Sequence, residues 1–408
     1  MHSTFRSLWR PSVAALLLSA TIATSAGATP ATVRATRLPQ LGSGVVAMDG
    51  TNALVGGRIG SPASQVHFFR EVGSTWEPSP MVGAIPTGPN VVLGSAVALS
   101  GSDAAVSSLN TKTNARSVYF FQRVGSVWHL LPGAFTDPNH NPRSENRGFV
   151  QGHYFALGIS LGHDWAFVGE PATVGGGSVV VYHHHNGWHQ VALLSDPRHV
   201  ALDAFGTSVT ITPNGTTALV GALNVSAANG EPANDGVAYL LRNEKGTWTV
   251  AQTLHEPTAG PDDLYGATLA ASNTDAIVGA FSDSGPGQHI GNEGAVYCYR
   301  LDSSGATLTQ VLNDPKEVSG DLFGSALAIS GSRVIVAATG VFSLVASRPI
   351  FTGAAYLYDL NNPGTTSTVI APSTRNLGTS VAIGSRDAWM LANGTTVNAP
   401  AFLVDARA

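Results

Sequence analysis

The sequence predicts an all-β protein that folds as a single seven-bladed β-propeller with four antiparallel strands in each blade. Two observations support this fold: one four-run pattern repeats seven times along the chain, and the composition combines 46 glycines with only 12% charged residues. Short apolar runs separated by glycine-rich turns are typical of strands rather than helices. One such sheet cannot bury both of its faces, so neighbouring copies must cover one another.

The repeating unit is clearest at 203–254. An acidic residue and an aromatic-glycine pair open it, at Asp203 and Phe205-Gly206. Four apolar runs then follow, each ended by turn residues: 207–212, 218–222, 236–241 and 248–254. The glycine at the start of the first run recurs at Gly42, Gly94, Gly158, Gly206, Gly266, Gly324 and Gly378. The spacing along the chain from one of these glycines to the next indicates propeller blades.

A tryptophan opens the fourth run in four repeats, at Trp76, Trp128, Trp188 and Trp248. We expect these side chains to pack between blades. The alternative is a lectin in which each tryptophan belongs to a shallow sugar pocket.

The two ends of the chain predict how the ring closes. The seventh repeat has three runs and lacks a fourth, whereas the segment 31–38 is a strand-like piece without a repeat of its own. Pairing this piece as the outer strand of the last blade would remove an open sheet edge.

At the repeat openings the chain resembles the FG-GAP repeat family, the propeller of integrin alpha subunits and of many secreted bacterial proteins. The match lies in Phe205-Gly206, Tyr265-Gly266 and Phe323-Gly324, and in the runs Val220-Gly221-Ala222 and Val278-Gly279-Ala280. The resemblance covers nearly all of 29–408 and implies the propeller fold. It says little about activity, because one fold supports many functions.

The segment 1–28 predicts a secretory signal peptide. Arg6 and Arg10 precede a short apolar run, and Ala26-Gly27-Ala28 matches the small-residue pattern that a signal peptidase accepts. The apolar run is shorter than the roughly 20 residues needed to span a bilayer. We therefore expect a secreted or periplasmic protein of one domain, 29–408, without a membrane span.

Charge argues against a nucleic-acid partner. The formal net charge is −5, and removal of 1–28, which contains two arginines and no acidic residue, changes it to −7. Nucleic-acid binding calls for a basic face. The one cysteine, Cys298, alternates with Tyr297 and Tyr299 in the third run of its repeat, so we expect a buried apolar role rather than a reactive thiol.

The turns between first and second runs predict no cofactor. Calcium-binding members of the resembled family carry several acids there, because a hard divalent ion takes six to eight oxygen ligands. Here each turn holds at most one acid, as in Asp49-Gly50-Thr51-Asn52 and Pro213-Asn214-Gly215-Thr216. We also interpret Asp203, Asp263 and Asp321, which precede the aromatic-glycine pairs, as turn and cap residues.

The histidines at 183–185 and His189 are the one other candidate metal site. Asn186-Gly187 predicts a two-residue hairpin turn, which would place His184 opposite His189 and His185 opposite Trp188. His184 and His189 could then share a metal, although zinc usually takes three or four ligands. A solvated hairpin tip is the alternative.

Long connections predict where a ligand binds. Extra residues follow the second run of repeats four to six (224–235, 281–293 and 339–352), and a further long connection covers 132–152. Long loops on a rigid scaffold often bind ligands. The candidate binding residues are those of the last connection and its end: Asp137, His140, Arg143, Glu145, Arg147 and His153.

The sequence contains no His-Glu-x-x-His pair and no phosphate-binding glycine loop between a strand and a helix. We therefore expect a non-enzymatic binding or adhesion-type propeller for a protein or glycan. The alternative is a carbohydrate-active hydrolase or lyase with paired carboxylates at the mouth of the central channel. The oligomeric state is not evident from the sequence.

Overall fold

The computed structural model describes residues 36–405, apart from single positions and several connections. The longer connections left out are 39–43, 58–64, 137–155, 224–234, 258–261, 284–292, 316–319, 370–376 and 393–400. The expected signal peptide, 1–28, lies outside the described residues. None of the described residues forms a helix long and apolar enough to cross a membrane.

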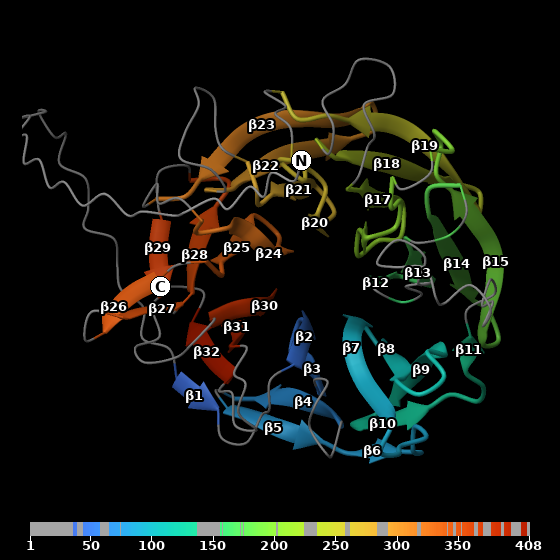
Figure 1. Cartoon of the computed structure of the whole chain (residues 1–408). Coiled ribbons are helices and arrows are strands. Elements are labelled where there is room, and N and C mark those ends of the chain that lie inside the picture. Colours follow the sequence, from blue (N-terminus) through green and yellow to red (C-terminus); the bar gives the residue numbers. More distant parts are fainter. Residues whose placement is uncertain are drawn as a thin grey trace, which may run out of the picture.

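The sheets stand around a common axis, with the blue start of the chain beside its red end (Figure 1). The innermost strands contact one another around the circle, and β2 meets β30 to close it. The chain is therefore a β-propeller.

Six sheets have four antiparallel strands and follow one another along the chain, apart from a single interruption after the first. The first contains β2 (Gly44–Asp49), β3 (Asn52–Gly57), β4 (Val66–Val72) and β5 (Thr75–Ser79). The next in chain order contains β12 (Ile159–Gly162), β13 (Trp165–Glu170), β14 (Ser178–His184) and β15 (Trp188–Ser195). It is followed by β16 (Ser208–Ile211), β17 (Thr217–Ala222), β18 (Val237–Glu244) and β19 (Thr247–Leu254).

The other three four-stranded sheets complete the later half of the chain. One contains β20 (Thr268–Ala271), β21 (Asp275–Ala280), β22 (Ala295–Asp302) and β23 (Gly305–Asn313). Another contains β24 (Phe323–Ser330), β25 (Arg333–Ala338), β28 (Ala354–Asp359) and β29 (Thr366–Val369). The last contains β30 (Leu377–Ile383), β31 (Asp387–Ala392), β32 (Ala401–Asp405) and β1 (Thr36–Leu38). The antiparallel pairing of β1 with β32 confirms the expected use of the N-terminal segment.

The expected number of seven four-stranded antiparallel blades is wrong. The described residues form six such blades, and the sheet after the first has six strands. It contains β6 (Met81–Val82), β7 (Val91–Ser100), β8 (Asp103–Asn110), β9 (Arg116–Val124), β10 (Val127–Leu130) and β11 (Phe135–Thr136). β6 pairs with β10 in parallel, so the sheet is not purely antiparallel either.

A proline explains why the strand beside β9 is split into β10 and β11. β10 covers only the end of β9, and β11 covers Ser117 and Val118 near its start. Pro132 and Gly133, which has a φ of +93°, separate the two pieces. Proline has no amide hydrogen to donate to a ladder, so the outer strand is broken at this point.

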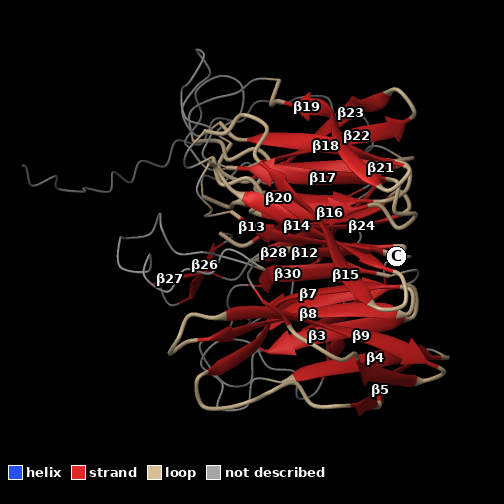
Figure 2. Ribbon diagram, turned by 90° about the vertical axis from the view of Figure 1, so that its right-hand side faces the viewer, coloured by secondary structure: helices blue, strands red, loops and turns tan. Residues whose placement is uncertain are grey.

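A two-stranded hairpin of β26 (Phe342–Val345) and β27 (Arg348–Phe351) lies outside the ring (Figures 1 and 2). It belongs to the connection between β25 and β28, where the sequence has one of its long insertions.

The core lies between adjacent sheets. The second strands β13, β17 and β21 are buried along their whole length, because both faces of each sheet meet a neighbour. The fourth strands β15 and β19 lie at the rim and are largely exposed. Cys298 on β22 is fully buried, and burial raises the pKa of its thiol to about 12, which confirms the expected apolar role.

Candidate functional site

The predicted binding residues on the long connection cannot be placed. Asp137, His140, Arg143, Glu145, Arg147 and His153 all lie outside the described residues. The connection departs from β11, where Phe135 packs edge-on against Phe120 at 5.3 Å and Tyr182 at 4.9 Å between ring centroids. These six residues stay a prediction.

The predicted histidine register is wrong by one residue. His184 pairs with Trp188 and His183 with His189, which leaves a three-residue loop at 185–187. Asn186 and Gly187 both have positive φ, and the His185 amide donates to the carbonyl of Gly187 within that longer loop. Since side chains alternate across a strand, His184 and His189 project to opposite faces of the sheet.

His184 is held between two blades. Its ring stacks on Trp188 at 5.0 Å, and its Nδ1 lies 3.7 Å from Oδ1 of Asp103 on β8. His189 is exposed at the rim. The two histidines therefore do not converge on one ion.

The tryptophans pack between blades, as expected. Trp128 stacks on Phe68 of the preceding sheet at 4.5 Å, and Trp188 stacks on Phe120 at 4.4 Å. Trp248 meets Phe167 edge-on at 4.9 Å. Trp76 is half-buried against the apolar cluster that joins the first and last sheets. Buried indoles of this kind offer no stacking platform to a sugar.

The central channel is lined by the first strands of the sheets. Where these strands end, the described residues that line the channel are mostly Val, Leu, Ile, Ala and Ser, and Asp49 is the one ionisable residue among them. Asp49 accepts a hydrogen bond from the amide of Gly101 in the next blade. This end of the channel thus offers one carboxylate among the described residues, whereas glycoside hydrolysis needs two.

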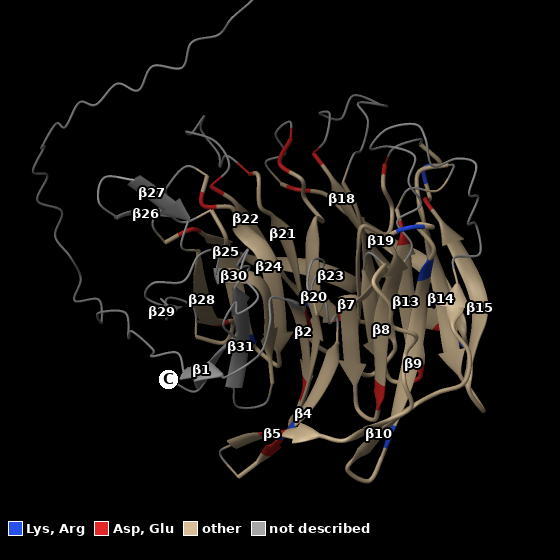
Figure 3. Cartoon of the chain, turned by 60° about the horizontal axis from the view of Figure 1, so that its bottom comes forward, with Lys and Arg blue, Asp and Glu red and all other residues tan. Residues whose placement is uncertain are grey.

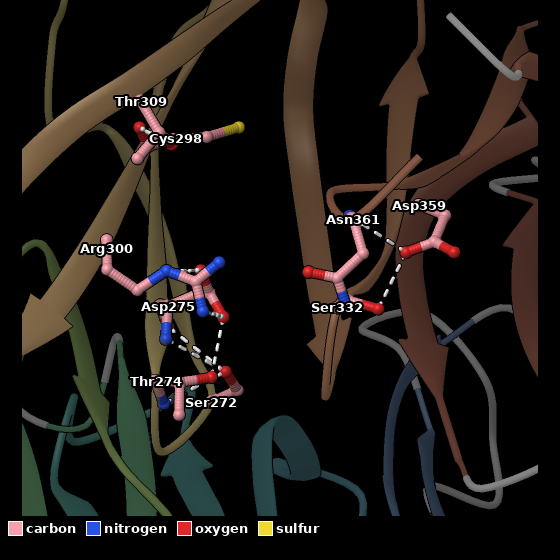
Figure 4. Close-up of polar contacts among 9 residues, drawn as sticks. All are labelled: Ser272, Thr274, Asp275, Cys298, Arg300, Thr309, Ser332, Asp359 and Asn361. Carbon is pink, nitrogen blue, oxygen red and sulfur yellow. Dashed lines mark hydrogen bonds and ion pairs between the residues drawn. The ribbon is translucent and has the colours of Figure 1, made fainter. Parts of the chain in front are cut away.

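Acids in the short turns are used within the protein. Figure 4 shows Asp275 bound by Arg300 and by the hydroxyl of Thr274 (Oγ1 to Oδ2, 2.6 Å), while its amide donates to Ser272 Oγ at 3.1 Å. The same view shows Asp359 accepting from Ser332 Oγ at 2.7 Å and from the amide of Asn361 at 3.1 Å.

Buried acids gather instead where the chain crosses from one blade to the next. Three successive crossings share an acid-proline pair followed, after five residues, by Asp-x-aromatic-Gly. The acids are Asp196 and Asp203, Glu256 and Asp263, and Asp314 and Asp321, and each is at most 5% exposed. Figure 3 shows several acids, in red, near the strand ends of β21 and β22.

Backbone geometry explains the repeated crossing motif. In the second crossing Leu264 has a φ of +58° and Gly266 one of +85°, and the amide of Ala267 donates to the carbonyl of Leu264. Tyr265 donates its amide to the carbonyl of Asp235 in the preceding blade. A β-turn with a left-handed glycine thus directs the chain across the junction, and the preceding aspartate points into the interior.

Glycine is required at these junctions because two backbones touch. A Cβ on Gly221 would lie 2.1 Å from the carbonyl oxygen of Gly266, and a Cβ on Gly169 would lie 1.9 Å from that of Gly206. The glycine of the aromatic-glycine pair in one blade therefore meets the glycine of the second strand in the blade before it.

The first crossing contains its own cation. Nε of Arg198 lies 3.7 Å from Oδ2 of the fully buried Asp203. Asp196 accepts hydrogen bonds from the amides of Arg198 at 3.1 Å and Val200 at 3.0 Å.

The second crossing brings three acids together. Glu256, Asp263 and Asp283 are buried, and each offers an oxygen within 4.8 Å of the other two. The Tyr297 hydroxyl, on β22, bonds to Oε1 of Glu256 and lies 3.1 Å from Oδ2 of Asp283. Burial raises the pKa of Glu256 to about 9; the bond from Tyr297 opposes the rise, and the charges of Asp283 and Asp263 add to it.

The interpretation of Asp203, Asp263 and Asp321 as turn and cap residues did not predict that these acids lie in the interior. Asp203, Asp263 and Asp321 do stand in turns, but they are 0%, 4% and 1% exposed. The signal that could have revealed them is the acid-proline pair at a constant distance before Asp-x-aromatic-Gly in three consecutive repeats.

Comparison with known proteins shows the fold only. No family model and no curated protein matches the sequence. A prolyl endopeptidase structure matches at a TM-score of 0.51 and 14% identity; the match covers 89% of this chain and 47% of that one, so the chain spans about half its length.

Two further matches are looser. The Pan2 WD40 domain of Neurospora crassa has a TM-score of 0.47 and 12% identity, with 90% of each chain covered. The fucose-specific lectin of Aleuria aurantia has a TM-score of 0.37 and 15% identity, with 64% of this chain and 74% of that chain covered. The identities are too low for activity to be transferred.

Proposed function

We propose that the protein is an exported FG-GAP-type propeller that binds a protein or glycan through the face carrying its long connections. The observation that carries this proposal is the ring of sheets with long connections after its second strands, such as the connection of β26 and β27 between β25 and β28. Where the first strands end, the described residues that line the channel are mostly apolar, with the single carboxylate of Asp49. A rigid ring with long connections on one face is suited to binding.

The junction glycines support assignment to the FG-GAP type. The two short motifs that carry the resemblance, aromatic-Gly and Val-Gly-Ala, are the two sides of one contact between blades, as at Gly266 and Gly221. Wherever both motifs occur, the same close contact between two blades requires the two glycines.

The proposed ligand surface includes the connection with Asp137, His140, Arg143, Glu145, Arg147 and His153. The test is binding of the labelled protein to a glycan array and to immobilised surface proteins of the producing cell. We expect the double variant Arg143→Ala, Arg147→Ala to lose at least tenfold in affinity. Lys245→Gly, in the β18–β19 turn on the opposite face, is the control and should bind normally.

The same assay distinguishes the alternative. Release of shortened glycans would favour a carbohydrate-active enzyme over a binding protein. Equal binding by the parent and by the Arg143, Arg147 variant would contradict the proposed surface.

Export is part of the proposal and has a separate test. If 1–28 is a signal peptide, the protein recovered outside the cytoplasm should begin near Thr29 when its N-terminus is sequenced. Retention in the cytoplasm with an intact N-terminus would contradict it.

A further inference from the structure

We propose that Glu256, Asp263 and Asp283 form a buried binding site for one Ca²⁺ ion between the blade of β16–β19 and the blade of β20–β23. The site does not lie in the turns between first and second strands, where calcium-binding members of the resembled family hold their ion and where we expect none here. It lies on the face that carries the long connections, because Asp283 belongs to the connection 281–293, but it contains none of the six candidate ligand residues of 132–153.

The geometry matches a single ion. Each of the three carboxylates offers an oxygen within 4.8 Å of the other two. Two oxygens that bind Ca²⁺ at about 2.4 Å lie at most about 4.8 Å apart. Glu256 follows β19, Asp263 belongs to the crossing segment, and Asp283 follows β21. An ion at this point would link two blades and the segment that joins them.

Glu256 supplies a second, independent observation. It is 5% exposed, and its Oε2 is buried without a hydrogen-bond partner among the described residues, while Oε1 bonds to Tyr297. A buried carboxylate oxygen without a partner is costly. Coordination of a cation would satisfy it.

The neighbouring crossings differ from this one in the residue that stands two positions after the first acid. In the first, Arg198 stands two residues after Asp196 and approaches Asp203. In the third, the sequence has Lys316 two residues after Asp314, although Lys316 lies outside the described residues. In the second crossing the same position is Thr258, which carries no charge. The second crossing thus lacks, at this position of the sequence, the basic side chain that the first crossing places near Asp203.

The donor set identifies the class of ion. All three side chains present carboxylate oxygens, and the described group contains neither sulfur nor imidazole. Oxygen-only sites suit Ca²⁺, Mg²⁺ and Mn²⁺ rather than zinc or copper. Ca²⁺ fits best because it accepts irregular geometry and gives up its water readily, whereas Mg²⁺ demands a near-octahedral shell and keeps several waters.

The test is calcium binding by the purified, chelator-treated protein. Isothermal titration should show one Ca²⁺ per chain, and saturating Ca²⁺ should raise the melting temperature by several degrees, more than Mg²⁺ does. Glu256→Gln should abolish the binding at this site. Asp196→Asn is the matched control, since it changes the equivalent position of the crossing that contains Arg198, and it should retain the site.

Asp283→Asn provides a second variant if Glu256→Gln fails to fold, and far-UV circular dichroism decides that point. Failure of the chelator-treated parent to bind Ca²⁺ would overturn the proposal. So would a preference for Mg²⁺, or unchanged Ca²⁺ binding in either folded variant.

Discussion

Replacing Gly266 with alanine should destabilise the junction between the blades of β16–β19 and β20–β23 by about 2–5 kcal/mol. Two terms contribute. The φ of +85° lies in the left-handed region, which costs a residue with a Cβ about 1–2 kcal/mol. The new Cβ would also lie 2.6 Å from the carbonyl oxygen of Val237, and overpacking of this kind costs about 1–3 kcal/mol.

Gly246→Ala separates the two terms. Gly246 has a φ of +91°, but a Cβ there would meet no atom within 4 Å. This control should therefore lose only the backbone term of about 1–2 kcal/mol.

Urea unfolding followed by tryptophan fluorescence would measure both variants against the parent. The reasoning predicts a larger loss for Gly266→Ala, with the difference giving the steric cost of the contact between blades. Equal losses in the two variants would refute it, because the close approach would then contribute nothing.

Three further predictions concern packing, pH and closure. Trp128→Ala should lower the free energy of unfolding by about 3–5 kcal/mol, since its fully buried indole stacks on Phe68. Trp76→Ala, at a half-buried position, should lower it less in the same urea assay. A larger loss in Trp76→Ala than in Trp128→Ala would contradict this packing. In the presence of chelator, the melting temperature should fall as the pH rises from about 4.5 towards 9. The reason is that Glu256, with its pKa raised to about 9, keeps a proton in the folded protein that the unfolded chain releases. Glu256→Gln should flatten this fall, and parallel pH profiles of parent and variant would exclude the Glu256 carboxyl as its source. Deleting 29–38, which includes β1, should lower the melting temperature sharply because β32 loses its partner, and an unchanged melt would show that this strand does not close the ring.

Local sequence patterns predicted most of the individual strands. Small apolar runs such as 218–222 became strands buried on both faces, and the tryptophans became contacts between blades. These features depend on residues close together in the chain or on a repeated neighbour, so a repeating pattern reveals them.

Register and strand number within a sheet were harder to predict. The Asn186-Gly187 pair correctly marked a hairpin, but one additional loop residue moved His184 opposite Trp188. The long connection was expected to begin at residue 132, yet β11 (Phe135–Thr136) lies within it and shares the edge of β9 with β10. A one-residue difference in a turn reverses the face of each side chain, and local preference does not determine that difference.

The sequence by itself determined a ring of repeated β-sheets, because alternation, turn chemistry and repetition are properties of neighbouring residues. Only the tertiary structure decided that Glu256, Asp263 and Asp283 meet in the interior. These acids come from the end of one blade, the segment that crosses to the next, and the second connection of that next blade. Their separation is set by how two sheets pack, through the contact of Gly221 with Gly266, and not by any spacing along the chain.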